Sequence, residues 1–484
     1  MPPAHRRCTS DLAIYVDAPH GHRPGSTIHG KVVRVAQLVA HQTQVSIILH
    51  GRAKSKIEET AENGSTFRTE FMLLNPIRHI LHDGSIAMSN APPSEWAFAI
   101  TLPERPHHAA LMRGGDKAKV LTPGGDKAKA SFLKLSPDAV AQHESPPTFR
   151  FDSNGCGLFK NYSEAYVEYW LEAELRTDCR VKGSSVYTAK LPVTVLAPPP
   201  PSPVWDLGMQ VLSRVRGQGI PVIFKSNAFL EAQVPKSGFK LGKLFHLTPT
   251  PQLHVTAMIN VPTVIQLEHP MPVPIIMRLY VCREYTHESL GGNPPPVTLE
   301  SVRLRIKSTT EVQTEGGWVT KIHTESGSHT TQLDVTRLQP NMQIVIPYAR
   351  EELNLADVVP FTLRARDILA LTTPPAAHRF APSDVETVYP DFTTYNIRHT
   401  HRAVWTFVLA AGGKEVELVR EMPLKIVSSS EPASDAPPPR DGALESESSR
   451  VGGGAESELP VYAPAAEEEA VPPYTARPSQ IVNA

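Results

Sequence analysis

The stretch Ala165-Tyr-Val-Glu-Tyr-Trp-Leu-Glu-Ala-Glu-Leu175 alternates between two sets of side chains along its whole length. A period of two places one set on the buried face of a β-strand and the other toward solvent. The same spacing and a high β-branched content recur in shorter segments, including Thr27-Ile-His-Gly-Lys-Val-Val-Arg-Val35, Gln44-Val-Ser-Ile-Ile-Leu49 and Trp96-Ala-Phe-Ala-Ile-Thr-Leu102. Helical periodicity is poor in these segments, so the sequence predicts an antiparallel β-sandwich.

The length of 484 residues exceeds what one hydrophobic core usually organises, so we expect two domains and some unstructured sequence. The 47 prolines fall between apolar stretches or in dense clusters, which suits short strands and turns. A hydrophobic content of 40% argues against a wholly disordered chain. A formal net charge of −1 argues against a nucleic-acid-binding protein with a strongly basic field.

The short-strand pattern divides the chain into two blocks. We predict a first sandwich over 11–197, a polyproline linker at 198–203 and a second sandwich over 204–427. The second block contains strand-like segments such as Leu253-His-Val-Thr-Ala-Met-Ile259 and Ala403-Val-Trp-Thr-Phe-Val-Leu409. An early connection, Arg23-Pro24-Gly25, is predicted to be a tight turn, because proline fixes φ and glycine accepts a positive φ.

The strand pattern fails at about 104–147, where Gly114-Gly-Asp-Lys-Ala-Lys119 recurs as Gly124-Gly-Asp-Lys-Ala-Lys129. Glycine and lysine together invite comparison with a phosphate-binding loop. No GK[ST] follows the required gap, however, and no strand leads directly into a helix. The sequence therefore predicts a flexible, solvated insertion.

The last residues, 428–484, have a composition unlike that of the preceding blocks. They hold ten acidic side chains and three arginines, a net charge of −7, so the preceding residues carry +6. The segment is rich in Ser, Glu, Pro, Gly and Ala and has few large apolar residues. Burial therefore could not offset its ordering entropy, and we predict a disordered acidic tail.

The order of these segments, together with several phrases, resembles the arrestin family, specifically fungal α-arrestins, over about 11–427. The resemblance implies an all-β fold of two tandem antiparallel immunoglobulin-like β-sandwich domains, acting as a scaffold for cytosolic segments of membrane transporters or receptors. The phrases that carry it are Tyr15-Val-Asp-Ala-Pro19, Arg23-Pro-Gly-Ser-Thr-Ile-His-Gly-Lys-Val-Val33, Phe98-Ala-Ile-Thr-Leu-Pro103, Pro146-Pro-Thr-Phe149, Tyr166-Val-Glu-Tyr-Trp-Leu-Glu-Ala-Glu-Leu175 and Tyr389-Pro-Asp-Phe-Thr-Thr-Tyr-Asn-Ile-Arg398.

Two short motifs in the tail share an apolar residue, a proline, any residue and a tyrosine. They are Leu459-Pro460-Val461-Tyr462 and Val471-Pro472-Pro473-Tyr474. A WW domain binds such ligands in polyproline II form, with the tyrosine in a neighbouring pocket. Leu459 and Val471 stand where the strict motif has proline, which weakens each copy. One copy alone would be read as a solvated linker, whereas two copies favour tandem WW domains bound with avidity.

Taken with the resemblance, the motifs predict an adaptor that links membrane-protein cargo to a WW-domain HECT-type ubiquitin ligase for ubiquitination and endocytosis. The tail has no lysine, so candidate ubiquitin acceptors lie on the cargo or on the body, where Lys117, Lys119, Lys127 and Lys129 stand out. The alternative is a trafficking or sorting scaffold of a related arrestin-like kind that acts without a ligase. That reading does not need the duplicated tyrosine motif.

A cytoplasmic location, peripheral to the plasma membrane or endosomes, is expected. Met1-Pro-Pro-Ala-His-Arg-Arg7 leads into no apolar segment, and no apolar run approaches the roughly 20 residues of a membrane span. Four widely separated cysteines fit a reducing compartment. The mildly basic body would permit weak contact with anionic membranes, although a charge of this size more often serves solubility alone.

The sequence contains no GxSxG elbow, no HExxH and no Walker or Rossmann glycine pattern. The closest histidine groups are His79-Ile-Leu-His82, His107-His108 and His399-Thr-His401. None completes a ligand set, so surface histidines are expected rather than a metal site. A lectin-like hydrolase, the remaining alternative, should show a secretory signal or convergent carboxylates. We therefore predict no enzyme, cofactor or nucleic-acid partner.

Overall fold

The computed structural model is an all-β protein built almost entirely from antiparallel sheets. It describes residues 7–8, 12–17, 21–36, 38–58, 66–88, 94–113, 131–153, 162–179, 183–200, 202–213, 218–231, 250–316, 319–325, 331–334, 344–360, 362–363 and 389–430. Both tail motifs, the duplicated glycine-lysine stretch and the four lysines within it lie outside the described residues.

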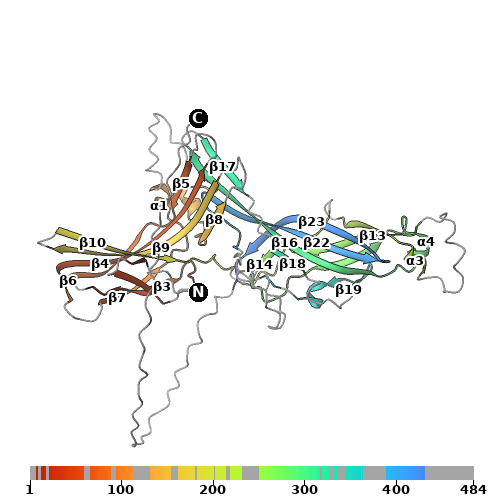
Figure 1. Cartoon of the computed structure of the whole chain (residues 1–484), viewed down its shortest axis with the longest axis horizontal. Helices are drawn as coiled ribbons and strands as arrows, with labels where there is room; N and C mark the ends of the chain where they lie inside the picture. The colour runs from red at the N-terminus through yellow and green to blue at the C-terminus, as the bar shows by residue number, and fades with distance from the viewer. Residues whose placement is uncertain are drawn as a thin grey trace, which may run out of the picture. The chain divides into compact units, whose positions relative to one another are not determined.

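Two sheets enclose the first core. A three-stranded sheet has the order β2 (Leu12–Val16), β3 (Thr27–Arg34), β7 (Ser94–Thr101). A seven-stranded sheet has the order β1 (Arg7–Cys8), β10 (Gly183–Val193), β9 (Tyr162–Cys179), β4 (Leu38–Glu58), β5 (Thr66–Met72), while β6 (Ile77–Met88) pairs with β4 and β8 (Phe149–Ser153) with β9. Strands β4, β9 and β10 run alongside one another (Figure 1).

The alternation in 165–175 has the predicted effect, since these residues lie within β9. Residues 165, 167, 169, 171, 173 and 175 of this strand are buried, and those between them face outward. The buried set packs in one cluster with Leu12, Ile28 and Phe98 of the three-stranded sheet. The predicted turn at Arg23-Pro24-Gly25 is also confirmed: the Ser26 amide donates to the Arg23 carbonyl over 3.0 Å, and Gly25 has φ of 86°.

Two further sheets enclose the second core. The five-stranded sheet contains β11 (Gln210–Val211), β12 (Ile220–Lys225), β13 (Gln252–Val261), β15 (Ile276–Val281) and β20 (Leu353–Asn354). The eight-stranded sheet contains β14 (Val264–Gln266), β16 (Val297–Gly316), β17 (Val319–Glu325), β18 (Thr331–Asp334), β19 (Ile344–Ile346), β21 (Phe392–Thr393), β22 (Ile397–Ala411) and β23 (Lys414–Val427).

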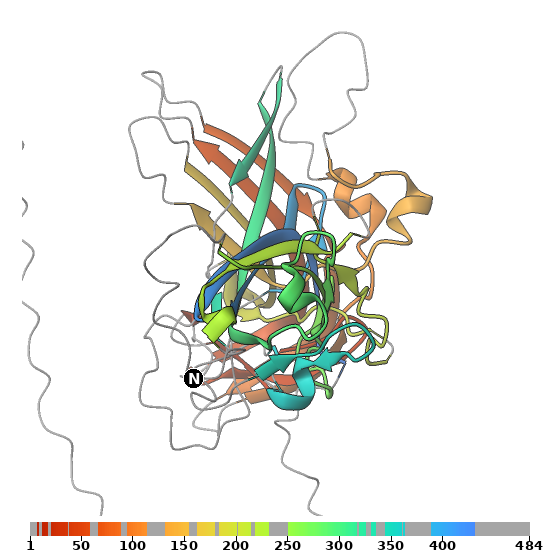
Figure 2. The same cartoon turned by 90° about the vertical axis from the view of Figure 1, so that its right-hand side faces the viewer.

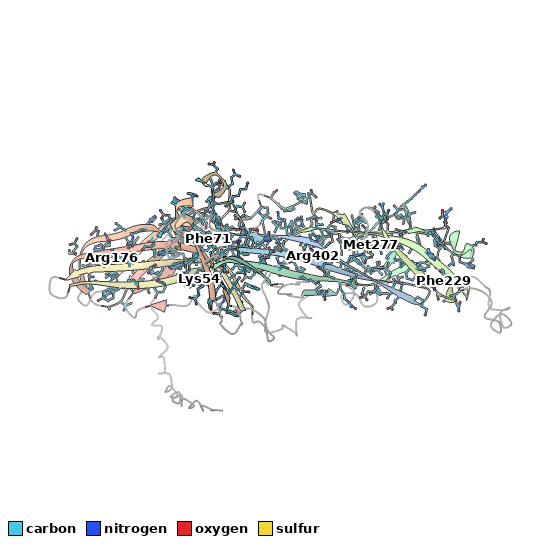
Figure 3. The ribbon with its side chains drawn as sticks, turned by 90° about the horizontal axis from the view of Figure 1, so that it is seen from above. Lys54, Phe71, Arg176, Phe229, Met277 and Arg402 are labelled. Carbon is cyan, nitrogen blue, oxygen red and sulfur yellow. The ribbon has the colours of Figure 1, made fainter. Side chains whose placement is uncertain are left out.

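The second core is filled by side chains from both of these sheets. Met277 of β15 faces the same cluster as Trp405 of β22, and both are fully buried. Phe229 and Met277 mark this core in Figure 3, and Phe71 marks the first. Among the named strand pairs, only β14 with β23 is parallel. The all-β prediction is therefore confirmed, while the boundaries 11–197 and 204–427 stay predictions.

Among the residues that the structure describes, five short helices interrupt the strands: α1 (His108–Arg113), α2 (Pro137–Val140), α3 (Ala228–Glu231), α4 (Glu288–Gly291) and α5 (Leu355–Val358). The longest of these described helices has six residues, too few to span a bilayer. The first two helices, drawn in orange in Figure 2, lie in the two described flanks of the predicted insertion at 104–147, which stays a prediction. Its flanks, 104–113 and 131–147, are packed, because Leu111 and Val140 are buried in the first core.

Candidate functional site: the junction and the outer sheet faces

The predicted WW-ligand motifs, 459–462 and 471–474, lie in the part of the chain that the structure does not describe. The described residues therefore give information on the two β-sheet cores and not on the motifs. Three features stand out among them: the junction between the two cores, the outer faces of the sheets, and the contacts of the last described residues, 428–430.

The junction forms where β16 and the start of β22 reach the first core. Val312, Tyr395 and Ile397 pack with the first cluster, although the strands around them belong to the eight-stranded sheet. The eight-stranded sheet therefore reaches the first core. There the ring centroid of Tyr395 lies 5.3 Å from that of Phe71. Residues carried by the eight-stranded sheet thus help to fill the first core.

A buried polar network runs through this junction. The side-chain amide of Asn396 donates to Ser55 Oγ over 2.9 Å, and Ser55 Oγ donates to the Gln313 carbonyl over 2.8 Å. The backbone amide of Gln313 returns a 2.9 Å bond to the Asn396 carbonyl. Asn396 and Ser55 are fully buried, so these bonds replace the water that both side chains lose on folding.

Aromatic rings close the junction on the side of β8. The Phe149 ring centroid lies 5.0 Å from that of Tyr389, 4.8 Å from that of Phe392 and 5.0 Å from that of His399. Two of these contacts are edge-on, the arrangement that aromatic quadrupoles favour. The phrase 389–398, which carried part of the family resemblance, is thus the segment that ties the second sheet to the first core.

The expectation that His399 and His401 are surface residues is wrong. They are 5% and 3% exposed, and their rings meet at 4.7 Å. His399 Nδ1 lies 2.9 Å from Thr310 Oγ1, and His401 Nδ1 donates to Asp391 Oδ1 over 2.6 Å. Burial follows because β22 is covered by rings from β8 and β21. Within the described residues, no group of three metal-ligating side chains is suitably placed to hold an ion.

The outer face of the seven-stranded sheet is densely charged. Arg52 of β4 binds Glu168 and, over 3.1 Å, Glu70, and its guanidinium lies 5.2 Å from the Trp170 ring centroid. Burial by itself would lower the pKa of Arg52, but the two carboxylates raise it. These contacts satisfy the charges within the sheet, so the face carries a network of ion pairs.

A second group of charges on this face centres on Glu174. Arg78 and Arg176 each lie 2.9 Å from Glu174 Oε2. Burial alone would raise the pKa of this carboxyl, but the two arginines lower it. Nearby, His50 stacks on Trp170 at a centroid distance of 4.8 Å, and burial lowers the pKa of its imidazole.

The outer face of the five-stranded sheet has a different composition. Its outward positions on β12, β13 and β15 carry two cations, Lys225 and Arg278, and Arg278 lies in register with Met258. Three large side chains on or beside this face are well exposed: Ile223 at 44%, Tyr280 at 38% and Tyr285 at 68%. We call this surface the β13 face. It comprises Pro221, Ile223, His254, Thr256, Met258, Ile276, Arg278, Tyr280 and Tyr285.

The end of the body is fixed to the predicted linker. Ser428 Oγ donates to the Pro198 carbonyl over 2.6 Å, and the Gln266 side chain donates to the Ser428 carbonyl over 3.2 Å. Arg23 of the first turn reaches the Ser429 carbonyl at 3.5 Å. The tail therefore begins where the linker leaves the first core.

Sequence reasoning missed the junction residues and the β13 face. Asn396 looks like a turn residue, and its burial depends on strands more than 300 positions away. The β13 face did leave a signal: of the outward positions in 220–225 and 252–258, only Lys225 is charged, and the others are Pro, Ile, Gln, His, Thr and Met.

The chain matches no model of a known protein family, and it matches no curated protein.

Proposed function

We propose that this chain is an arrestin-like adaptor, with two immunoglobulin-like sandwiches that hold membrane-protein cargo and a tail that recruits a WW-domain HECT-type ubiquitin ligase. The observation that carries the proposal is the combination of a two-core all-β body with two apolar-Pro-x-Tyr motifs beyond it. The adaptor would act in the cytoplasm at the plasma membrane or endosomes, leading to ubiquitination and endocytosis of the cargo. The proposal assigns the chain no catalytic step and no cofactor.

The fixed start of the tail supports a tethering role. With Ser428 bound to Pro198 and Gln266, the ligase would be held at a defined point of the body. The first motif begins 29 residues after Ser430. A flexible chain of that length has a root-mean-square reach of roughly 30 Å. A recruited ligase would therefore stay close to lysines of the cargo and of the body.

The paired tyrosines support binding by avidity. Tyr462 and Tyr474 lie 12 residues apart. Each copy lacks the first proline of the strict motif, so a single site should bind weakly. Once one WW domain is bound, a second domain of the same ligase meets the other copy at an effective concentration on the order of millimolar. Two weak sites then act as one stronger site.

The experiment is a calorimetric titration of the full chain with a tandem WW protein. Single Tyr462→Ala and Tyr474→Ala variants should bind several-fold more weakly, and the double variant should show no measurable binding. Tyr285→Ala, which removes an exposed tyrosine from the body, is the matched control and should bind like wild type. Wild-type affinity in the double variant would refute ligase recruitment through the tail and leave the ligase-independent sorting scaffold as the better reading.

A further inference from the structure

One arginine at the end of the first sandwich is buried without a counter-charge. Arg34 is the last residue of β3, and it is only 2% exposed. Its Nε and Nη1 atoms are buried and have no hydrogen-bond partner in the part of the chain that the structure describes. A guanidinium stays protonated inside a protein, so Arg34 cannot lose its charge as a buried carboxyl or imidazole could. Arg34 is therefore an uncompensated buried cation.

Arginines on the outer face of the seven-stranded sheet have the partners that Arg34 lacks. Arg52, for example, binds Glu70 over 3.1 Å. On β7, the strand paired with β3, the one acidic residue is Glu95, and Lys31 holds it over 2.9 Å. Strand β3 itself contains no acidic residue. The described strands β3 and β7 therefore supply no carboxylate for Arg34.

An aromatic ring from the opposite sheet contacts the guanidinium. The Cζ atom of Arg34 lies 4.5 Å from the ring centroid of Tyr187 on β10 (strands β3 and β10 in Figure 1). This cation–π contact offsets only part of the cost of removing the charge from water. Tyr187 is in register with Leu175, and Leu175 with Val45. Two residues from Val45, Thr43 is fully buried, and its hydroxyl also has no partner among the described residues.

The guanidinium lies close to the rim of the sandwich. Val35, which follows Arg34, is 59% exposed. Val186, which precedes Tyr187, is 57% exposed. A small anion can therefore approach Arg34 from the strand ends without crossing the apolar core.

The single charge of this site favours a monovalent anion. A carboxylate matches the planar fork of a guanidinium and can accept two parallel hydrogen bonds from it. Its one negative charge makes the buried pair neutral. A phosphate group would bring a charge of about −1.5 to −2 at pH 7 against one cation and would leave a net charge in the interior. Since burial penalises a net charge, a carboxylate should bind better than a phosphate.

We propose that this end of the first sandwich binds a small carboxylate, which pairs with the guanidinium of Arg34 while Tyr187 supports that guanidinium through its ring face. The bound anion would supply the counter-charge that the described strands lack. The proposal concerns the body alone and depends neither on the tail motifs nor on a ligase.

The test is thermal unfolding of the full chain at pH 7 in sodium acetate and in sodium chloride of equal ionic strength, so that general screening is the same in both. If the dissociation constant is about 10 mM, 100 mM acetate should raise the Tm of the wild type by about 4 °C. Arg34→Met should remove this rise. Its Tm in chloride should equal or exceed that of the wild type, because the uncompensated charge is gone.

An exposed arginine provides the matched control. Arg303→Met, on the outer side of β16, should respond to acetate as the wild type does. Tyr187→Phe retains the ring and should keep the response, whereas Tyr187→Leu should weaken acetate binding several-fold. Circular dichroism of each variant verifies folding.

Asp11 tests whether the chain itself supplies the carboxylate. It precedes Leu12, the register partner of Arg34 on β2, and it lies outside the described residues. Asp11→Asn should leave the Tm in chloride and the acetate response unchanged. A fall of several degrees in chloride would show that Asp11 neutralises Arg34 and would overturn the proposal. The proposal also fails if the wild type shows no rise in acetate, if Arg34→Met shows the same rise, or if phosphate at equal ionic strength raises the Tm more than acetate does.

Discussion

Asn396 offers the sharpest test of the junction, because its side chain is fully buried and its amide nitrogen donates to Ser55 Oγ over 2.9 Å. The same nitrogen also lies 3.5 Å from the carbonyl oxygens of Ala53 and Thr69. Asn396→Asp keeps the shape of the side chain but replaces this donor with an oxygen. The introduced carboxylate would face three oxygen atoms, and no cationic side chain contributes to the network of Asn396, Ser55 and Gln313 described above.

The expected loss of stability at pH 7 is about 3–5 kcal/mol, the usual cost of an uncompensated buried charge. Burial disfavours the charged form, so the folded-state pKa of the introduced carboxyl should rise well above its unfolded value of about 3.9. The protonated acid can donate to Ser55. The penalty is therefore absent below the unfolded pKa and grows as the pH rises toward the folded pKa, leaving only about 1 kcal/mol near pH 4.5.

The assay is urea unfolding of wild type and variant at pH 7 and at pH 4.5. Asn293→Asp, at an exposed position, is the matched control and should change stability by less than about 0.5 kcal/mol. A loss at Asn396→Asp below about 1 kcal/mol at pH 7, or a loss of the same size at both pH values, would show that this side chain is not the buried donor described.

Three further predictions follow from the first core. Glu174→Gln should lower the free energy of unfolding by about 0.5–1 kcal/mol at pH 7. Because the folded-state pKa of Glu174 is lowered, the difference between variant and wild type should vanish as the pH falls through this folded-state pKa. Denaturant midpoints measured from pH 7 to pH 3 would show this loss. Gly30→Ala should cost about 2–3 kcal/mol in thermal or chemical unfolding, since its Cβ would stand 2.2 Å from the Tyr15 carbonyl oxygen, whereas Gly291→Ala meets nothing within 4 Å and should be nearly neutral. Tyr169→Phe should cost about 1–2 kcal/mol, measured by urea unfolding, because it removes a buried 2.8 Å hydrogen bond and leaves a carbonyl unsatisfied.

The strands that could be predicted are those whose outward and inward residues differ clearly. The alternation in 165–175 is a local property, and it gave the correct faces of β9. Strand β4 runs on to Glu58, well past the predicted Gln44–Leu49. The sequence pattern does not reveal the continuation to Glu58, because several inward positions there are small residues rather than large apolar ones. One of them, Gly51, is required by a neighbour, since a Cβ there would lie 2.7 Å from the Tyr169 ring.

The junction could not be predicted because its determinants are distant in the sequence. The burial of His399 depends on the rings of Phe149 and Phe392, which β8 and β21 bring over β22. The polar group of Asn396 likewise finds its partner 341 positions away. A local pattern records which face of a strand is apolar, but not which distant element covers it.

The composition of the first core also determines when it can fold during synthesis. Val312, Tyr395 and Ile397 are needed to complete the cluster that Leu12 begins, so the first core cannot close while only its own sheets have been made. At a synthesis rate of roughly 5–20 residues per second, the 341 residues between Ser55 and Asn396 take about 20–70 s to appear. During that interval the nascent chain exposes the apolar surface around Phe71. Tyr395 covers this surface only after it has been synthesised. A chaperone at the ribosome would have its binding site there, and a fragment ending at the linker would keep it exposed.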